Sequence, residues 1–250
     1  MEDVSIPAAT LVLFRDGDGA AEHLFVERAG TMAFAAGAIV FPGGRVDAGD
    51  RLIALHFPAL DPDDAAARIA AIRETIEEAG VAVGFDAMPD AATLATMRAQ
   101  LIEGMVFGDV IAAAGLRLDL SALTWFARWC PNMRETRNFD TRFFLARFSD
   151  CAPTASVDAT ENVRLFWATA QSVLDDADAG KVRIIFPTRR NLERLAKLGS
   201  YDAAVAEAAV IAPEKIVPFF DERDGERYLC IPADRGYPVT AELLTKAVRG

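Results

Sequence analysis

The fold of this 250-residue chain follows from nine residues, Arg73-Glu74-Thr75-Ile76-Glu77-Glu78-Ala79-Gly80-Val81. The surrounding sequence reads as helix, and Glu74 and Glu78, four residues apart, lie on one helix face. Like charges at this spacing destabilise an isolated helix by roughly 0.2–0.5 kcal/mol per pair. A solvated acidic face is the ordinary explanation for such a cluster. The functional one is a hard divalent cation such as Mg²⁺ or Mn²⁺, which prefers oxygen ligands.

A second signal stands upstream, at Phe41-Pro42-Gly43-Gly44. The apolar residues 38–41 lead into a proline and two glycines, a pattern that marks a sharp turn out of a strand. Glycine at such a turn lets the backbone approach a ligand or a metal closely. The glycine turn and the acidic helix together favour a functional cluster over a solvated face.

Together the two segments resemble the Nudix box of the Nudix hydrolases. That box reads Gly, five residues, Glu, seven residues, then Arg-Glu-apolar-x-Glu-Glu-x-Gly-apolar. Its second half matches residues 73–81, with Thr75 at a position that is usually apolar. In its first half Gly44 matches and the acidic position is Asp50. Twenty-two residues, 51–72, separate Asp50 from Arg73 where the box has seven, an insertion of fifteen.

The insertion leaves the helix that carries the box intact. Asp61 is expected to be its N-cap and Pro62 its first residue, followed by two aspartates that favour the first turn. The pattern therefore predicts a helix over residues 62–79, ended by Gly80 as a C-cap and preceded by a lengthened loop.

A box split in this way is similar to the Nudix branch that includes the peroxisomal coenzyme A diphosphatase. Residues 24–44 partly follow the coenzyme A pyrophosphatase pattern, whose second arginine is Ala33 here. Residues 137–144, Arg-Asn-Phe-Asp-Thr-Arg-Phe-Phe, resemble the Arg-Arg-Phe-Asp-Thr segment of the branch, with Asn138 in place of one arginine.

The resemblance implies a metal site and a base on one helix turn. The implied ligands of Mg²⁺ or Mn²⁺ are Glu74, Glu77, Glu78 and the Gly43 carbonyl. Arg73 would orient the carboxylates through a salt bridge, and either Glu74 or Glu77 would also serve as the base, a choice that sequence leaves open because the carboxylates share one cluster. The metal would neutralise the bridging phosphates while a water attacks in line.

For most of the other candidate site residues, both a functional and a structural interpretation are open. Arg28, Gly44 and Arg137 are expected to bind the substrate; for the two arginines, a surface salt bridge is the alternative to a phosphate contact. Asp50 either replaces the first glutamate of the box or is structural. Glu161 is either an additional ligand or base, or a solvated loop residue.

Aromatic and histidine side chains are interpreted mainly as structural. Trp125, Trp129 and Phe139 either stack on an adenine or belong to the core, and strand aromatics are more often core. His23 and His56 lie in no motif.

Composition limits partners and compartment. A net charge of −11 argues against a broad nucleic-acid surface, and no apolar stretch approaches the ~20 residues of a membrane span. The acidic start lacks the basic residues of a signal peptide, and the last residues carry no peroxisomal address. The three cysteines match neither a disulfide framework nor a zinc site and are predicted to be reduced and mostly buried, which favours the cytoplasm. A homodimer is possible because the apolar content permits it.

The predicted fold class is α/β (α+β), a Nudix fold whose mixed β-sheet lies between helices. One unit is expected over residues 1–250, with a core of about 5–180, a helical insertion of about 90–117 on the substrate side, and a C-terminal extension of about 181–250. Strands are predicted at residues 9–14, 23–27, 38–41, 123–129, 141–148 and 163–167. Helices are predicted over 91–114 (one or two), from a Thr169 cap to Gly180, and from a Thr188 cap to Gly199. Residues 215–220 and 226–231 are expected to form a hairpin around Asp224-Gly225.

The predicted function is metal-dependent cleavage of the pyrophosphate bond in a nucleoside diphosphate linked to another group. Coenzyme A or an acyl derivative is the leading substrate, and ADP-ribose, a nucleotide sugar or NADH is the alternative. A catalytically silent domain that senses a nucleotide is the alternative of another class. The intact Arg73, Glu74, Glu77 and Glu78 argue against it, because a pure binder has no need of this acidic set.

Overall fold

The computed structural model describes residues 5–17, 19–30, 35–131, 138–148 and 162–247. At its centre lies an eight-stranded mixed sheet. Its strands are β1 (Ile6–Arg15), β2 (Glu22–Arg28), β3 (Ile39–Val40), β4 (Gly43–Arg45), β5 (Thr124–Trp129), β6 (Phe139–Arg147), β7 (Asn162–Thr169) and β8 (Lys215–Ile216).

The pairing of β1 makes the sheet mixed. β1 runs parallel to β6 from Ile6 opposite Phe139 to Phe14 opposite Arg147, and antiparallel to β2 and β4. β2 pairs antiparallel with β7, and β5 pairs antiparallel with β6 and parallel with β8. This sheet brings the glycines of β4 and the ends of β2 and β7 to one region.

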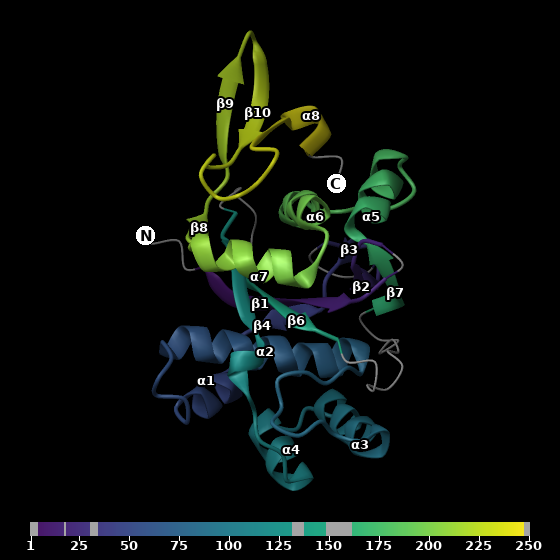
Figure 1. The fold of residues 1–250 in the computed structure, drawn as a ribbon, viewed down its shortest axis with the longest axis vertical. Coiled ribbons are helices and arrows are strands. Elements are labelled where there is room, and N and C mark those ends of the chain that lie inside the picture. Colours follow the sequence, from purple (N-terminus) through teal and green to yellow (C-terminus); the bar gives the residue numbers. More distant parts are fainter. Residues whose placement is uncertain (1–4, 18, 31–34, 132–137, 149–161, 248–250) are drawn as a thin grey trace.

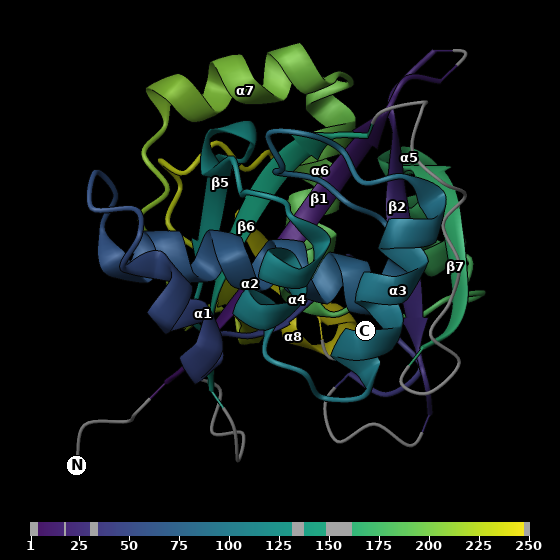
Figure 2. The same cartoon turned by 90° about the horizontal axis from the view of Figure 1, so that it is seen from below.

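Helices cover both faces of the sheet (Figure 1). One layer holds α1 (Ala48–Ala54), α2 (Pro62–Ala79), α3 (Ala91–Ile102) and α4 (Phe107–Ala114), and the other holds α5 (Ala170–Asp178), α6 (Phe186–Leu198) and α7 (Tyr201–Val210). Figure 2 looks onto the first layer, with α2 lying across the strands. Each layer has its own apolar core against the sheet. The predicted mixed sheet between helices is confirmed.

The helix α2 has the predicted ends. The Asp61 side chain accepts hydrogen bonds from the backbone N–H groups of Asp63 and Asp64, both at 3.0 Å, and Gly80 ends the helix with a φ of 63°. Thr75 stands in a buried position that is usually apolar. Its hydroxyl donates to the carbonyl of Ala71 at 2.7 Å, which satisfies the polar group inside the helix.

Three predicted details are wrong. The lengthened loop is partly helical, since α1 occupies its first half. The helix assigned to a Thr188 cap begins earlier, at Phe186, because Pro187 suits the first turn of a helix. The strand predicted over residues 215–220 is divided at Pro218, so that β8 joins the main sheet and β9 (Phe219–Arg223) leaves it.

The predicted segment 91–114 forms two helices, α3 and α4, which separate at Gly104, where φ is +85°. Thr169 caps α5 as predicted by accepting a hydrogen bond from the Ser172 N–H at 3.1 Å. The helix α7 was not predicted, because its alanine-rich sequence carries little amphipathic pattern.

The C-terminal segment forms a smaller three-stranded sheet of β9, β10 (Glu226–Cys230) and β11 (Ala241–Leu243), followed by α8 (Leu244–Ala247). Asp224-Gly225 makes the predicted hairpin turn, with both residues at positive φ. In Figure 1 this hairpin projects beyond α6. The segment stays tied to the main sheet because the Trp129 indole N–H donates to the Tyr237 hydroxyl at 2.9 Å.

Two further findings concern the described residues. Within them, no helix is both long and apolar enough to cross a membrane. Cys130 and Cys230 are free and buried, as predicted for these two cysteines, while Cys151 lies outside the described residues.

Candidate active site

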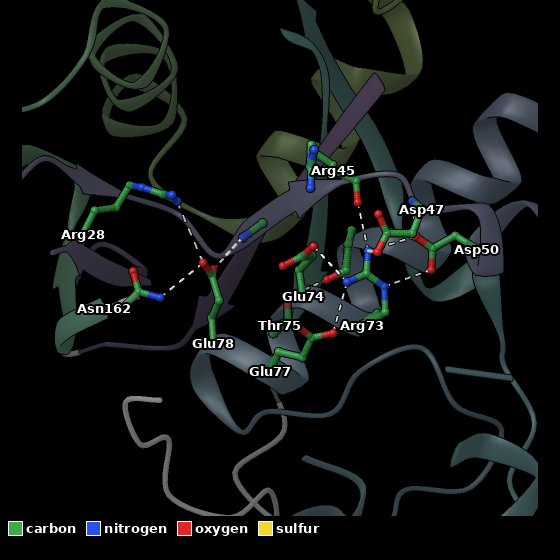
Figure 3. Close-up of polar contacts among 12 residues, drawn as sticks. Arg28, Arg45, Asp47, Asp50, Arg73, Glu74, Thr75, Glu77, Glu78 and Asn162 are labelled. Carbon is green, nitrogen blue, oxygen red and sulfur yellow. Dashed lines mark hydrogen bonds and ion pairs between the residues drawn. The ribbon is translucent and has the colours of Figure 1, made fainter. Parts of the chain in front are cut away.

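The last two turns of α2 meet β4, the start of α1, and the ends of β2 and β7 at one place (Figure 3). The helix contributes its carboxylates and one arginine, and the other elements contribute the groups that hold them.

Arg73 is the centre of one half of this site. Its guanidinium is buried and forms two hydrogen bonds to Asp50, Nε to Oδ1 at 3.0 Å and Nη2 to Oδ2 at 2.9 Å. Its Nη1 donates to Glu74 at 2.9 Å and to Glu77 at 3.1 Å, and Nη2 also donates to the carbonyl of Arg45 at 2.9 Å. A single guanidinium thus joins three carboxylates, a use that fits its rigid fork of donors.

Asp50 reaches Arg73 because it lies in the first turn of α1, before the insertion. α1 starts immediately after Asp47, whose backbone N–H donates to Asp50 at 2.8 Å. Asp50 is fully buried, whereas the Asp47 carboxylate is 60% exposed and lies 3.6 Å from Arg73. The insertion therefore lies beyond Asp50 and does not separate this carboxylate from Arg73 in space.

Glu78 forms the other half of the site and has different partners. Its carboxylate accepts a hydrogen bond from the Gly43 N–H at 2.9 Å and from the Asn162 side-chain amide at 3.2 Å. Arg28 Nη1 lies 4.0 Å from it. Glu78 is buried, and these partners come from β4, β7 and β2, all far away in sequence.

The glycine turn fits closely around the helix. A Cβ atom at Gly44 would overlap the Glu74 carboxylate, and one at Gly43 would overlap the backbone of β1. Only glycine at these two positions lets β4 pair with β1 while the carboxylate of Glu74 rests against the backbone.

The site carries an excess of negative charge. Burial raises the pKa of Glu74 to about 8, a shift opposed by Arg73 and reinforced by the charges of Glu78 and Glu77. Burial also raises the pKa of Glu77, again opposed by Arg73. Burial acts to lower the pKa of Arg73, but its hydrogen bond to Asp50 and the surrounding carboxylates raise it further above its usual value.

The donor set fits a hard divalent cation. The last two turns of α2 carry Glu74, Glu77 and Glu78, and the Gly43 backbone lies against Glu78, so that the available donors are the carboxylate and carbonyl oxygens that such ions prefer. Within the described part of the chain, no three acidic, histidine or cysteine side chains converge as a ligand cluster. Glu74 and Glu77 are turned toward Arg73, and Glu78 is turned toward Gly43.

The structure brings together most of the residues expected at the site: Arg28, Gly43, Gly44, Asp50, Arg73, Glu74, Glu77 and Glu78. The remaining two, Arg137 and Glu161, lie outside the described residues.

Sequence reasoning missed Asn162 and Asp47. Asn162 opens β7, and no local pattern relates it to Glu78, which is 84 positions away. Asp47 precedes α1 and could have been found as its N-cap. Trp129 is 1% exposed and belongs to the core, and His23 is buried against Phe14, as the structural readings of both residues predicted.

Three comparisons with known proteins agree. A family model described as the NUDT19 Nudix domain matches residues 54–195. A Caenorhabditis elegans protein that carries the name nudix hydrolase 7 is 26% identical over 219 residues, covering 86% of this chain and 69% of that protein. The crystal structure of a Nudix hydrolase from Alicyclobacillus acidocaldarius has a TM-score of 0.73 and 29% identity, covering 82% of this chain and 97% of that one.

The chain therefore belongs to the Nudix hydrolase family, in the coenzyme A diphosphatase-like branch that the split box predicted. Nudix hydrolases generally use divalent metal ions. The match to the family model begins at residue 54 and does not include Asp50. The pairing of Asp50 with Arg73 therefore rests on the geometry of this structure.

Proposed function

We propose that this chain is a divalent-metal-dependent hydrolase that cleaves the pyrophosphate bond of a nucleoside diphosphate joined to another group. The observation that carries the proposal is the Arg73 guanidinium, which binds Asp50, Glu74 and Glu77 together at the glycine turn. A structural acidic face has no need of this arrangement, since solvent would satisfy its carboxylates.

We assign the metal site to Glu74, Glu77, Glu78 and the Gly43 carbonyl, with Mg²⁺ or Mn²⁺ as the ion. Bound there, the ion supplies charge neutralisation at the bridging phosphates and a more acidic water. Arg73 holds Glu74 and Glu77 in orientation, and Asp50 takes the place of the first glutamate of the box by fixing Arg73. Either Glu74 or Glu77 accepts the proton of the attacking water.

Substrate phosphates would lie between the glycine turn and the end of β2. Arg28 lies 4.0 Å from the Glu78 carboxylate, and a guanidinium suits phosphate oxygens. We keep Gly44 as a substrate-binding residue from the sequence pattern, although the space beside its Cα is filled by the Glu74 carboxylate. We keep Arg137 as a further phosphate ligand and Glu161 as a further carboxylate from the sequence pattern.

Coenzyme A or an acyl derivative is our proposed substrate, because the chain matches the branch that the split box predicted. Cleavage would release adenosine 3′,5′-bisphosphate and 4′-phosphopantetheine or its acyl form. ADP-ribose, a nucleotide sugar and NADH share the nucleoside diphosphate and are the alternatives. The cytoplasm and a possible homodimer stay predictions from the sequence.

The test is incubation of the protein with Mg²⁺ or Mn²⁺ and a panel of coenzyme A, acyl-coenzyme A, ADP-ribose, a nucleotide sugar and NADH. Products are separated by chromatography. The proposal expects coenzyme A or its acyl form to turn over fastest. Turnover of another member alone overturns the substrate assignment, and binding without turnover of any member supports the nucleotide sensor instead.

A further inference from the structure

Arg98 of α3 lies at the C-terminal end of the helix that carries the acidic cluster. Its Nε donates to the backbone carbonyl of Glu77 at 3.0 Å, and its Nη2 donates to the carbonyl of Glu78 at 3.1 Å. The guanidinium also packs against Gly80, where a Cβ atom would lie 3.0 Å from Nη1. Figure 2 shows α3 beside this end of α2.

The end of α2 needs a cation for two reasons. The last carbonyls of a helix have no partners within it, and the helix dipole places partial negative charge there. In α2 this end also carries Glu77 and Glu78, while the last turn has no basic residue of its own. Arg98 supplies from α3 the positive charge and the donors that α2 lacks.

Two consecutive carbonyls bound by one planar guanidinium fix the backbone that bears Glu77 and Glu78. A lysine in the same place offers a single point charge and no fork of donors. Through this contact a residue of α3 can influence the positions of the Glu77 and Glu78 carboxylates without contacting them.

We infer that Arg98 is a positioning residue for the acidic turn, holding the backbone of Glu77 and Glu78 where their carboxylates bind the metal. The inference rests on the proposed function for its catalytic consequence. It predicts that the loss of Arg98 weakens metal binding itself, in addition to any effect on stability.

The experiment compares R98M and R98K with wild type in the full chain. R98M keeps an unbranched apolar side chain but has no donors, and R98K keeps the charge. R117M is the matched control, because Arg117 lies at the other end of the helical insertion, is 86% exposed and pairs with Asp86 at 3.3 Å. Mn²⁺ affinity is measured by calorimetry without substrate, turnover is measured on the best panel substrate, and both are done well below the unfolding temperature.

Groups that orient metal ligands typically change metal affinity or activity by 10–100-fold, so R98M should weaken Mn²⁺ binding and lower kcat by about tenfold. R98K should lie between R98M and wild type, and R117M should match wild type. A folded R98M with wild-type Mn²⁺ affinity and kcat overturns the inference, even if its melting temperature is lower. If R98M does not fold, the Mn²⁺ affinity of R98K is the test. An affinity equal to that of wild type overturns the inference, and a weaker affinity supports it.

The two proposals fail in different ways. A wild-type protein that binds no Mn²⁺ and cleaves no panel member overturns the proposed function and this role with it. A wild-type protein that does both, with R98M and R98K equal to it, overturns the role of Arg98 alone.

Discussion

The two faces of the main sheet bury charge in different ways. Against α2 the buried charges are the carboxylates of Asp50 and Glu78, at 0% and 4% exposure, together with Arg73 at 6%. Against α6 they are arginines, with Arg190 and Arg194 each at 1%. Arg194 pairs with Glu207 at 2.6 Å, and Arg190 pairs with Glu193 and Glu242 at 2.7 and 3.0 Å.

The buried charges at α6 have a structural role, whereas we assign a functional role to those at α2. Arg194 also lies 3.9 Å above the Phe126 ring, so that this cation is held by packing as well as by its carboxylate. At α2 one guanidinium, that of Arg73, is shared by three carboxylates. Burial raises the pKa of Glu74 to about 8, a shift that Arg73 opposes and the charges of Glu78 and Glu77 reinforce. At α6 the buried arginines pair with carboxylates and join the helix to neighbouring elements. At α2 the clustered carboxylates are the groups that we propose as metal ligands.

Glu78→Gln should have the largest effect on the α2 face. A bound metal contributes several kcal/mol to transition-state stabilisation, and 1.36 kcal/mol corresponds to tenfold, so kcat should fall by about a thousandfold or more. The loss in stability should be small, about 1 kcal/mol, because the amide keeps an oxygen for the Gly43 N–H and loses only the hydrogen bond from Asn162. Turnover of the best panel substrate and thermal unfolding are the measurements.

The control for this variant is Glu207→Gln on the α6 face. It removes the carboxylate partner of Arg194 and should cost stability while the folded enzyme keeps its activity. If Glu78→Gln kept its activity, the metal-ligand assignment would be refuted.

Asp50→Asn tests how far Arg73 depends on its buried partner. Removing one member of a buried ion pair typically costs 3–5 kcal/mol, and we expect about 3 kcal/mol because Glu74 and Glu77 remain beside Arg73. Urea unfolding measures the free energy of unfolding. Asp47→Asn is the matched control, since Asp47 is 60% exposed and such pairs contribute about 0–1 kcal/mol. Equal losses in both variants would contradict a special role for Asp50.

His23 gives the α6 face a pH dependence of its own. The ring is buried, and burial lowers its pKa from 6.5 to about 4, although the hydrogen bond to the Leu13 carbonyl at 3.1 Å acts in the opposite direction. The unfolded chain therefore binds more protons between pH 6.5 and 4. The contribution of His23 to stability is complete above pH 6.5 and is lost as the pH falls toward 4, amounting to about 3 kcal/mol.

The measurement is the free energy of unfolding of wild type and His23→Gln at pH 7.5 and at pH 4. Glutamine does not titrate, so the difference between the two proteins should shrink by about 3 kcal/mol at the lower pH. If the difference in the free energy of unfolding did not change with pH, the pKa of His23 would be the same in the folded and the unfolded protein, and burial would not lower it.

Local chemistry made α2 predictable from sequence. Asp61, Pro62 and Gly80 act within a few residues of the helix ends, and the carboxylate spacing places Glu74 and Glu78 on one face. Likewise the turn at Asp224-Gly225 depends only on residues that accept positive φ. Features that arise within one turn of chain can be found in one sequence.

What sequence could not provide depends on contacts across the fold. Asp50 is joined to Arg73 because α1 packs against α2. The spacing of residues along the sequence does not reveal that two helices pack together. Asn162 and Arg98 reach Glu78 from other elements, with an amide and a guanidinium that carry no local signature. Pro218 could have indicated a break in the strand predicted over residues 215–220, but no local pattern identifies β5 as the partner of β8.

Asn162→Ala is the smallest and sharpest test of how the α2 face holds its carboxylates. The Asn162 amide donates to Glu78 Oε1 at 3.2 Å, while Gly43 N–H holds Oε2 at 2.9 Å. Loss of a group that orients a metal ligand costs 10–100-fold, and we expect about tenfold in kcat because the Gly43 contact remains. Val163→Ala, at the exposed next position of β7, is the control for strand effects. If Asn162→Ala kept the wild-type kcat, the Gly43 backbone alone would be sufficient to position Glu78. The Asn162 side chain would then contribute to packing and not to catalysis.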